Sequence, residues 1–181
     1  MGSLRLFIAL EVPEAHRHRL YTLRDPSWKA RWATPEQFHL TLRFLGQVEE
    51  KVLPALEHTL ADIRLPAFWL HIRGLVVFPS PTRPRVLAAA VDPAAPLRTL
   101  QAEIERRVVD LGFAPEPKPF HPHITLARLK QVAPTRVRLF LERYQNFSLE
   151  PFSVAHFTLF ESHLHPQGAR YVSLQQFPLQ A

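Results

Sequence analysis

The chain has no cysteine among its 181 residues. It therefore has no disulfide, no thiolate nucleophile and no cysteine-ligated zinc site. Its longest apolar runs, such as LFIAL at 6–10, are far shorter than the roughly 18 residues that a membrane-spanning helix needs. We therefore expect a soluble protein with no membrane association. The lack of cysteine suits a reducing compartment, so we predict a cytoplasmic protein.

Lysine is also scarce, since only 4 of the 22 basic residues are lysine and 18 are arginine. The net charge of +6 favours a polyanionic or phosphorylated partner, because a basic surface attracts such ligands over a long range. Arginine adds a planar fork that can bind two phosphate oxygens at once. A bias in genomic base composition would produce the same arginine content, so composition leaves both explanations open.

The chain is long enough, with 46% apolar residues, for one domain spanning residues 1–181. Apolar residues at helical spacing predict helices at 13–25, 49–64, 96–112 and 134–144. Alternating apolar residues predict strands at 5–12, 37–45, 67–78, 84–91, 123–128, 152–162 and 170–177. This interleaved order, with one strand phrase occurring twice, predicts an α+β fold made by duplication.

The repeated phrase occurs in PEQFHLTLRFLG and again in PFHPHITLARL. The first copy reads His39-Leu-Thr41, and the second reads His123-Ile-Thr125. Residues two apart in a strand share a face, so each histidine lies beside its threonine. One histidine in a strand is more often structural than catalytic, but a matched pair in two strands favours a shared active site.

The same alternation predicts which residues face the core. It places Arg43 on the face of His39, and Ala127 on the face of His123. The core-facing residues are then Phe38, Leu40, Leu42 and Phe44 in the first strand and Ile124 and Leu126 in the second.

Two imidazoles and two hydroxyls suit phosphoryl transfer without a metal. One neutral imidazole removes a proton from the attacking oxygen, and one imidazolium protonates the departing oxygen. Histidine supplies both forms near neutral pH. The threonine hydroxyls can donate hydrogen bonds to the non-bridging phosphate oxygens. A strained cyclic phosphate is the substrate that needs the fewest catalytic groups beyond these four, because its ring already aligns the leaving oxygen.

Five stretches of the chain resemble the RNA 2′,3′-cyclic phosphodiesterases, also called 2′-5′ RNA ligases, of the two-histidine phosphoesterase superfamily. These are RLFIALEVP, RWATPEQFHLTLRFLG, VVFPSPTRPRVL, LGFAPEPKPFHPHITLAR and FTLFESHLHPQGARY. The resemblance implies a bilobal fold, in which a pseudo-twofold duplication gives two antiparallel sheets with helices on the outer faces and a central cleft. It covers nearly the whole chain.

The resemblance also implies the reaction and the residue roles. The activity would be metal-independent and cofactor-free hydrolysis of RNA 2′,3′-cyclic phosphate ends to 2′-phosphomonoesters, with reversible ATP-independent 2′-5′ ligation as a secondary activity. His39 would be the proton donor to the O3′ leaving group, and His123 the proton acceptor that activates water. Thr41 and Thr125 would bind the phosphate. The residue spacing alone does not decide which histidine is the acid.

Two further residues are candidates for substrate binding. Arg128 matches the arginine that ends the second motif of the resembled family, but strict alternation places it on the face opposite His123. Either the strand twists or bulges there, or Arg128 is a structural cation. Phe120 precedes the second strand and is a candidate for stacking on the RNA base, although an aromatic residue in that place usually belongs to the core.

Other functions use the same residues differently. The pairs His121/His123 and His163/His165 could ligate zinc, but neither continues into a fuller ligand pattern, so we expect no metal site. An RNA-binding module without catalysis would also be basic, yet the sequence has no RNA-binding signature of the Gly-aromatic type. A phosphodiesterase acting on 2′-5′ linkages or on small cyclic nucleotides would share the paired histidines. No pattern in the sequence indicates an obligate protein partner, so we expect a monomer.

Overall fold

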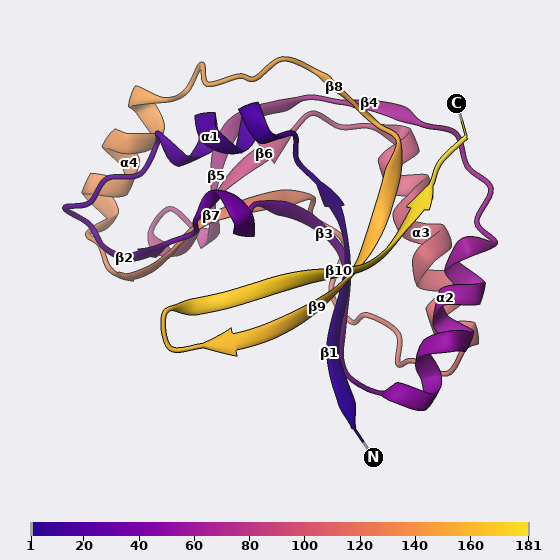
Figure 1. The fold of residues 1–181 in the computed structure, drawn as a ribbon. Coiled ribbons are helices and arrows are strands. Elements are labelled where there is room, and N and C mark those ends of the chain that lie inside the picture. The colour runs from indigo at the N-terminus through magenta and orange to yellow at the C-terminus, as the bar shows by residue number, and fades with distance from the viewer. Residues whose placement is uncertain (1, 181) are drawn as a thin grey trace.

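Two four-stranded sheets form the centre of the computed structural model, which describes residues 2–180 (Figure 1). The first sheet has the order β10 (Gly168–Pro178), β9 (His156–His165), β1 (Ser3–Glu11) and β3 (His39–Glu49). The second sheet has the order β2 (Lys29–Trp32), β7 (His123–Gln131), β6 (Arg83–Val91) and β5 (Ile72–Ser80). Neighbouring strands are antiparallel in both sheets. The predicted α+β class with antiparallel sheets is therefore confirmed.

Both sheets combine strands from the two halves of the chain. The first sheet joins β1 and β3 to β9 and β10, and the second joins β2 to β7. A small third sheet pairs β4 (Phe68–Leu70) with β8 (Phe152–Val154). These long-range pairings mean that neither half of the chain can complete a sheet without the other.

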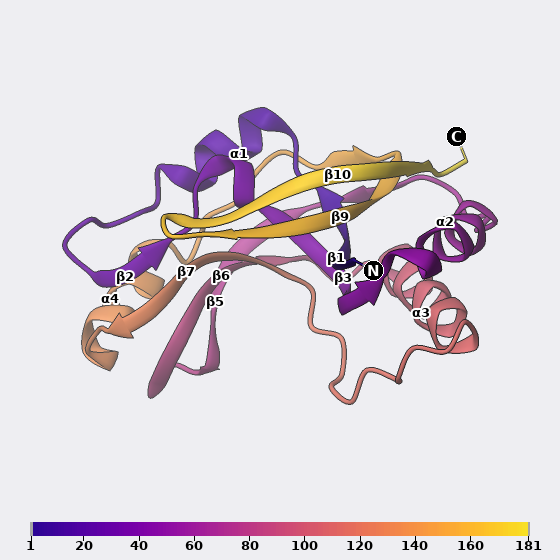
Figure 2. The ribbon, with the colours of Figure 1, turned by 60° about the horizontal axis from the view of Figure 1, so that its bottom comes forward.

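Four helices and two 3₁₀ turns accompany the sheets. The helices are α1 (Glu14–Tyr21), α2 (Leu53–Ala61), α3 (Ala95–Asp110) and α4 (Pro134–Arg143), and the turns are η1 (Pro35–Gln37) and η2 (Glu50–Val52). Helices α2 and α3 pack against each other at one end of the molecule, while α4 lies at the other end, near β2 (Figure 2). Among the described residues, no helix is both long and apolar enough to cross a membrane.

Three sequence-based predictions about the elements were wrong. The predicted strand at 152–162 is two strands, β8 and β9, which separate at Ala155 and belong to different sheets. The predicted strand at 67–78 is in fact two strands, β4 and β5, which separate at His71 and belong to different sheets. Strand β2 was not predicted, because its four residues carry too short a pattern. Helix α3 ends at Asp110, two residues before the predicted stop at Gly112, whose φ of 116° is one that glycine adopts without steric cost.

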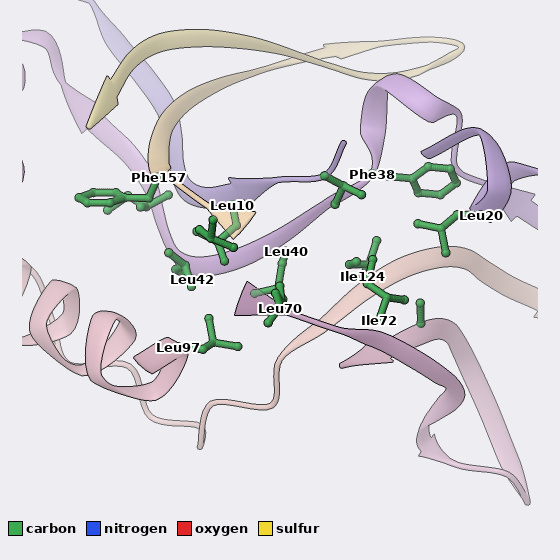
Figure 3. Packing of buried hydrophobic residues seen from close by; sticks show 14 of the residues in the cluster. Leu10, Leu20, Phe38, Leu40, Leu42, Leu70, Ile72, Leu97, Ile124 and Phe157 are labelled. Atoms are coloured by element: carbon green, nitrogen blue, oxygen red, sulfur yellow. The ribbon is translucent and has the colours of Figure 1, made fainter. Parts of the chain in front are cut away.

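The hydrophobic core fills the space between the sheets and the helices. Leu40 and Leu42 of β3 point into it together with Leu10, Leu70 and Ile124 (Figure 3). All five are at most 3% exposed. This packing fixes the backbone of β3, so the residues that alternate with Leu40 are held rigidly on the opposite face.

A β-bulge interrupts the alternation of β3. Arg43 pairs with Ile8 of β1, but Thr41 pairs with Ala9, so Leu42 is an extra residue in the ladder. A bulge of this kind reverses the facing of the residues that follow it, here Arg43 and Phe44, up to a second register shift at Leu45. Strand β3 therefore alternates as predicted only up to Leu42.

The bulge makes two predicted orientations wrong. Phe44 was expected in the core, but it is 61% exposed. Arg43 was expected beside His39, but it is 7% exposed. Its Nε donates to Glu105 Oε1 of α3 at 2.6 Å, and another guanidinium nitrogen donates to the carbonyl of Ala114. Arg43 therefore links β3 to α3 and to the loop that leads toward β7.

Candidate active site

His39 is the first residue of β3 and is held by the turn that precedes it. The backbone N–H of Thr34 donates to Gln37 Oε1 at 2.9 Å, and Gln37 Nε2 donates to the carbonyl of Ala169 in β10 at 2.7 Å. The backbone of Gln37 in turn makes a hydrogen bond with the imidazole of His39. The turn therefore fixes the orientation of the ring.

His123 is the first residue of β7 and is held in a similar way. Its Nδ1 lies 2.7 Å from the carbonyl oxygen of His121. Because a carbonyl oxygen only accepts, Nδ1 must carry the proton of the neutral ring. The lone pair of neutral His123 is then on Nε2, which suits a proton acceptor. Each histidine is thus tethered by the backbone of the residue two positions before it.

The two histidines lie in neighbouring parts of the structure, since β3 and β7 contact each other between the sheets. The pKa of His39 is lowered to about 4. Burial is the main cause and the charge of His123 adds to it, while the hydrogen bond with Gln37 acts in the opposite direction. In the free protein, His39 is therefore neutral at pH 7.

Aromatic rings surround both imidazoles. The ring of His39 lies 4.8 Å from that of Phe7 and 5.0 Å, edge-on, from that of Tyr171. The ring of Phe160 lies 6.2 Å from His39. In the second sheet, Phe78 of β5 lies 4.9 Å from His123. These contacts remove water from the imidazoles and restrict their rotation. These contacts could not be predicted from the sequence, because the aromatic residues come from distant strands.

Thr41 and Thr125 lie one position beyond a buried residue, on the same faces as His39 and His123. Both threonines are partly buried. Within residues 2–180, neither hydroxyl makes a hydrogen bond to another protein group, so both can donate to a ligand.

A second bulge lies at the equivalent place in β7. Ala127 pairs with Leu87 of β6, but Thr125 pairs with Ala88, so Leu126 is the extra residue. Ala127 is consequently 1% exposed, and its predicted place on the face of His123 was wrong. The two halves of the site therefore share one irregularity as well as one motif.

The bulge turns Arg128 to the face of His123 and Thr125. The sequence left open whether the strand twists or bulges before Arg128 or whether Arg128 is a structural cation. The structure contains the bulge. Burial raises the pKa of Tyr171, and the positive charge of Arg128 opposes that rise. Arg128 of the second sheet thus lies near Tyr171, which belongs to the first sheet and contacts His39 there.

Phe120 lies in the loop before β7 and packs, partly buried, against the hydrophobic core. Its carbonyl accepts a hydrogen bond from Arg98 Nη1 of α3 at 3.4 Å. These contacts support a structural role for Phe120, and stacking on an RNA base stays a prediction.

A hollow of about 110 Å³ opens beside His39. Its wall includes Glu11, Arg17, Glu36, Phe160 and Tyr171. The hollow is lined both by aromatic rings and by ionisable side chains, and it opens to solvent beside His39. Sequence reasoning missed Glu11, which pairs directly with His39 across β1 and β3.

Glu11 holds the strands around this hollow together. Its Oε2 accepts hydrogen bonds from His156 Nε2 at 2.7 Å, Thr158 Oγ1 at 2.8 Å and Gln176 Nε2 at 2.9 Å. Partial burial alone would raise the pKa of Glu11, but these three hydrogen bonds outweigh it and lower the pKa. An ionised carboxylate therefore fixes β1 against β9 and β10.

The model of the LigT-like phosphoesterase family matches the chain twice, over residues 10–88 and 89–171. The two matches divide the chain into repeated halves, one with each His-x-Thr motif. The chain belongs to the LigT-like phosphoesterase family. The resemblance inferred from the sequence is thereby confirmed, as is the duplication.

Curated members of the LigT-like phosphoesterase family are similar over most of their length. An RNA 2′,3′-cyclic phosphodiesterase from Aeropyrum pernix is 40% identical over 144 residues, which cover 78% of this chain and 81% of that protein. One from Thermus thermophilus is 38% identical over 189 residues, covering 97% of this chain and 90% of that protein.

Solved structures of LigT-like proteins have the same fold. A crystal structure from Thermus thermophilus has a TM-score of 0.80 and 34% identity, with 98% of this chain and 99% of that chain covered. Escherichia coli LigT in complex with 3′-AMP has a TM-score of 0.81 and 26% identity, with 99% of this chain and 100% of that chain covered. Within residues 2–180 of this chain, no group of three or more His, Asp or Glu side chains is arranged to hold a metal ion.

Proposed function

We propose that this protein hydrolyses RNA 2′,3′-cyclic phosphate ends to 2′-phosphomonoesters without a metal or cofactor. The observation that carries the proposal is the pair of equivalent imidazoles on β3 and β7, each tethered by the residue two positions before it. Membership of the LigT-like family and similarity to proteins named RNA 2′,3′-cyclic phosphodiesterase support the substrate class.

In the proposed mechanism, neutral His123 removes a proton from water through Nε2. The resulting hydroxide attacks phosphorus while the bond from phosphorus to O3′ breaks. Protonated His39 gives its proton to O3′, and the bond to O2′ remains, so the product is a 2′-phosphomonoester. Thr41 and Thr125 donate hydrogen bonds to the non-bridging oxygens, where negative charge increases in the transition state.

His39 must be protonated to act as the acid, although its pKa in the free protein is about 4. A cyclic phosphodiester carries one negative charge, and an opposite charge a few ångströms away stabilises an imidazolium. We propose that the bound substrate itself brings His39 to its protonated form. The reverse reaction, in which an RNA 5′-hydroxyl replaces water, would use the same groups and give a 2′-5′ linkage.

We also propose that the chain acts as a monomer in the cytoplasm. A cysteine-free sequence suits that compartment, and the two halves of the site come from one chain.

Single substitutions of the two histidines test the proposal. His39→Ala and His123→Ala should each lower kcat for a nucleoside 2′,3′-cyclic phosphate by about 10²–10⁴-fold, the usual effect of removing an acid or base. His18→Ala is the matched control, because His18 is an exposed histidine on α1 with a side chain 64% accessible. Unchanged turnover in either active-site variant would refute the paired-histidine mechanism.

A further inference from the structure

Three neighbouring strands of the second sheet are strongly basic. Strands β2, β7 and β6 together contain six basic residues and no acidic residue. Five of the six side chains have no hydrogen bond or ion pair within residues 2–180, and all five residues are exposed. We call these five residues the basic strip: Arg31, Arg83, Arg85, Arg128 and Lys130.

The strip differs from the arginines of α3. There, Arg106 and Arg107 both pair with Glu103, and Arg107 also pairs with Asp62 at 3.2 Å. In the strip, Arg31 and Arg128 are direct cross-strand neighbours. Like charges in that position destabilise a sheet. An anion that contacts both guanidinium groups would remove this repulsion.

One end of the strip lies at the catalytic face. Arg128 lies on the face of His123, and Arg31 is its cross-strand neighbour on β2. Beyond them, Arg83, Arg85 and Lys130 line a hollow of about 390 Å³. At about 3.3 Å per residue, Lys130 lies about 16 Å along β7 from Thr125. A phosphate held at the threonines cannot reach it.

We propose that the basic strip binds the sugar-phosphate backbone of the RNA strand whose cyclic phosphate end lies at the histidines. The polymer is taken to be RNA on the basis of the proposed function. Successive phosphates along a single strand match successive cations along β7 and β6. Arginine is suited to this task, because its fork contacts two phosphate oxygens. The strip would then distinguish an RNA end from a free cyclic nucleotide, since only the former extends past Arg128.

The test is binding of a fluorescently labelled, single-stranded RNA with a 2′-phosphate end, measured by anisotropy over a range of salt concentrations. The strip variant is the triple substitution Arg83→Gln/Arg85→Gln/Lys130→Gln. Each phosphate contact to a single strand contributes about 0.7 to the slope of log Kd against log salt. The variant should lower that slope by about 2 and weaken binding about 100-fold at about 0.1 M salt.

A second triple variant controls for net charge. Lys51→Gln/Arg64→Gln/Arg106→Gln removes the same charge from exposed residues around η2, α2 and α3. It should leave the slope within about 0.5 of the parent value. Equal losses in both triple variants would mean that overall charge explains binding, and would overturn the proposal. The single variant Arg31→Gln should lower the slope by about 0.7.

Turnover of a nucleoside 2′,3′-cyclic phosphate separates the two proposals. This substrate does not reach the hollow, so its kcat/KM should change less than threefold in the strip variant, whereas kcat/KM for the RNA should fall in parallel with affinity. A parent protein that binds RNA through the strip but turns over neither substrate would contradict the proposed function alone. Intact turnover with no effect of the strip substitutions on RNA binding would contradict the strip alone.

Discussion

Binding of a phosphate group should raise the pKa of His39 from its value of about 4 in the free protein. At that pKa, about one imidazole in a thousand is protonated at pH 7, so half-protonation requires roughly 4 kcal/mol of stabilisation. A unit negative charge about 4 Å away supplies about 4 kcal/mol at an effective dielectric constant of about 20. One bound phosphate anion is therefore sufficient to bring the pKa to about 7.

The assay is a pH titration of the His39 ring by NMR, with and without a saturating nucleoside 2′-monophosphate. Assignment of the His39 signal comes from its loss in His39→Ala. The matched control is Thr41→Val/Thr125→Val, which removes two hydroxyls while keeping side-chain shape, and should reduce the rise in pKa by weakening phosphate binding. The same midpoint with and without the ligand would refute the idea that substrate protonates its own acid.

Two further substitutions test the consequences of the bulges. Arg43→Met should lower the free energy of unfolding by about 3 kcal/mol in urea denaturation, because it leaves the Glu105 carboxylate without its buried partner; adding Glu105→Leu should recover part of the loss. A decrease of less than about 1 kcal/mol in the free energy of unfolding would show that the Arg43–Glu105 ion pair contributes little to stability. Arg128→Ala should raise KM for a nucleoside 2′,3′-cyclic phosphate at least about tenfold, the value of a charged hydrogen bond, and Arg128→Lys should restore it only partly. An unchanged KM would place Arg128 outside the substrate site.

Alternation in the sequence was sufficient to predict the strands that carry the histidines. Leu40, Leu42 and Ile124 are apolar and are buried in the core. The residues that alternate with them, His39 and His123, were therefore expected on the other face. The duplicated motif then linked two strands that are far apart in the sequence. These predictions succeeded because each depends on residues within one strand.

The bulges could not be read from the same pattern. After Leu42 the sequence continues with Arg43 and Phe44, which still alternate between polar and apolar, although the strand has already changed face. Burial of Arg43 is stabilised by Glu105, a residue 62 positions away. The orientation of Arg128 depends in the same way on the pairing of β7 with β6. Such long-range contacts leave no local signal.

The surroundings of His39 were missed for a similar reason. Phe7, Phe160 and Tyr171 come from β1, β9 and β10, which meet only in the folded sheet. The low pKa of His39 follows from this burial, so the proposal that substrate protonates His39 depends on the structure and could not be made from the sequence.

The most direct measurement is the identity of the product formed from RNA with a 2′,3′-cyclic phosphate end in the presence of EDTA. The account predicts complete conversion to the 2′-phosphomonoester, because His39 protonates O3′ and no metal takes part. Formation of the 3′-phosphomonoester, or loss of activity in EDTA that a metal ion restores, would contradict it.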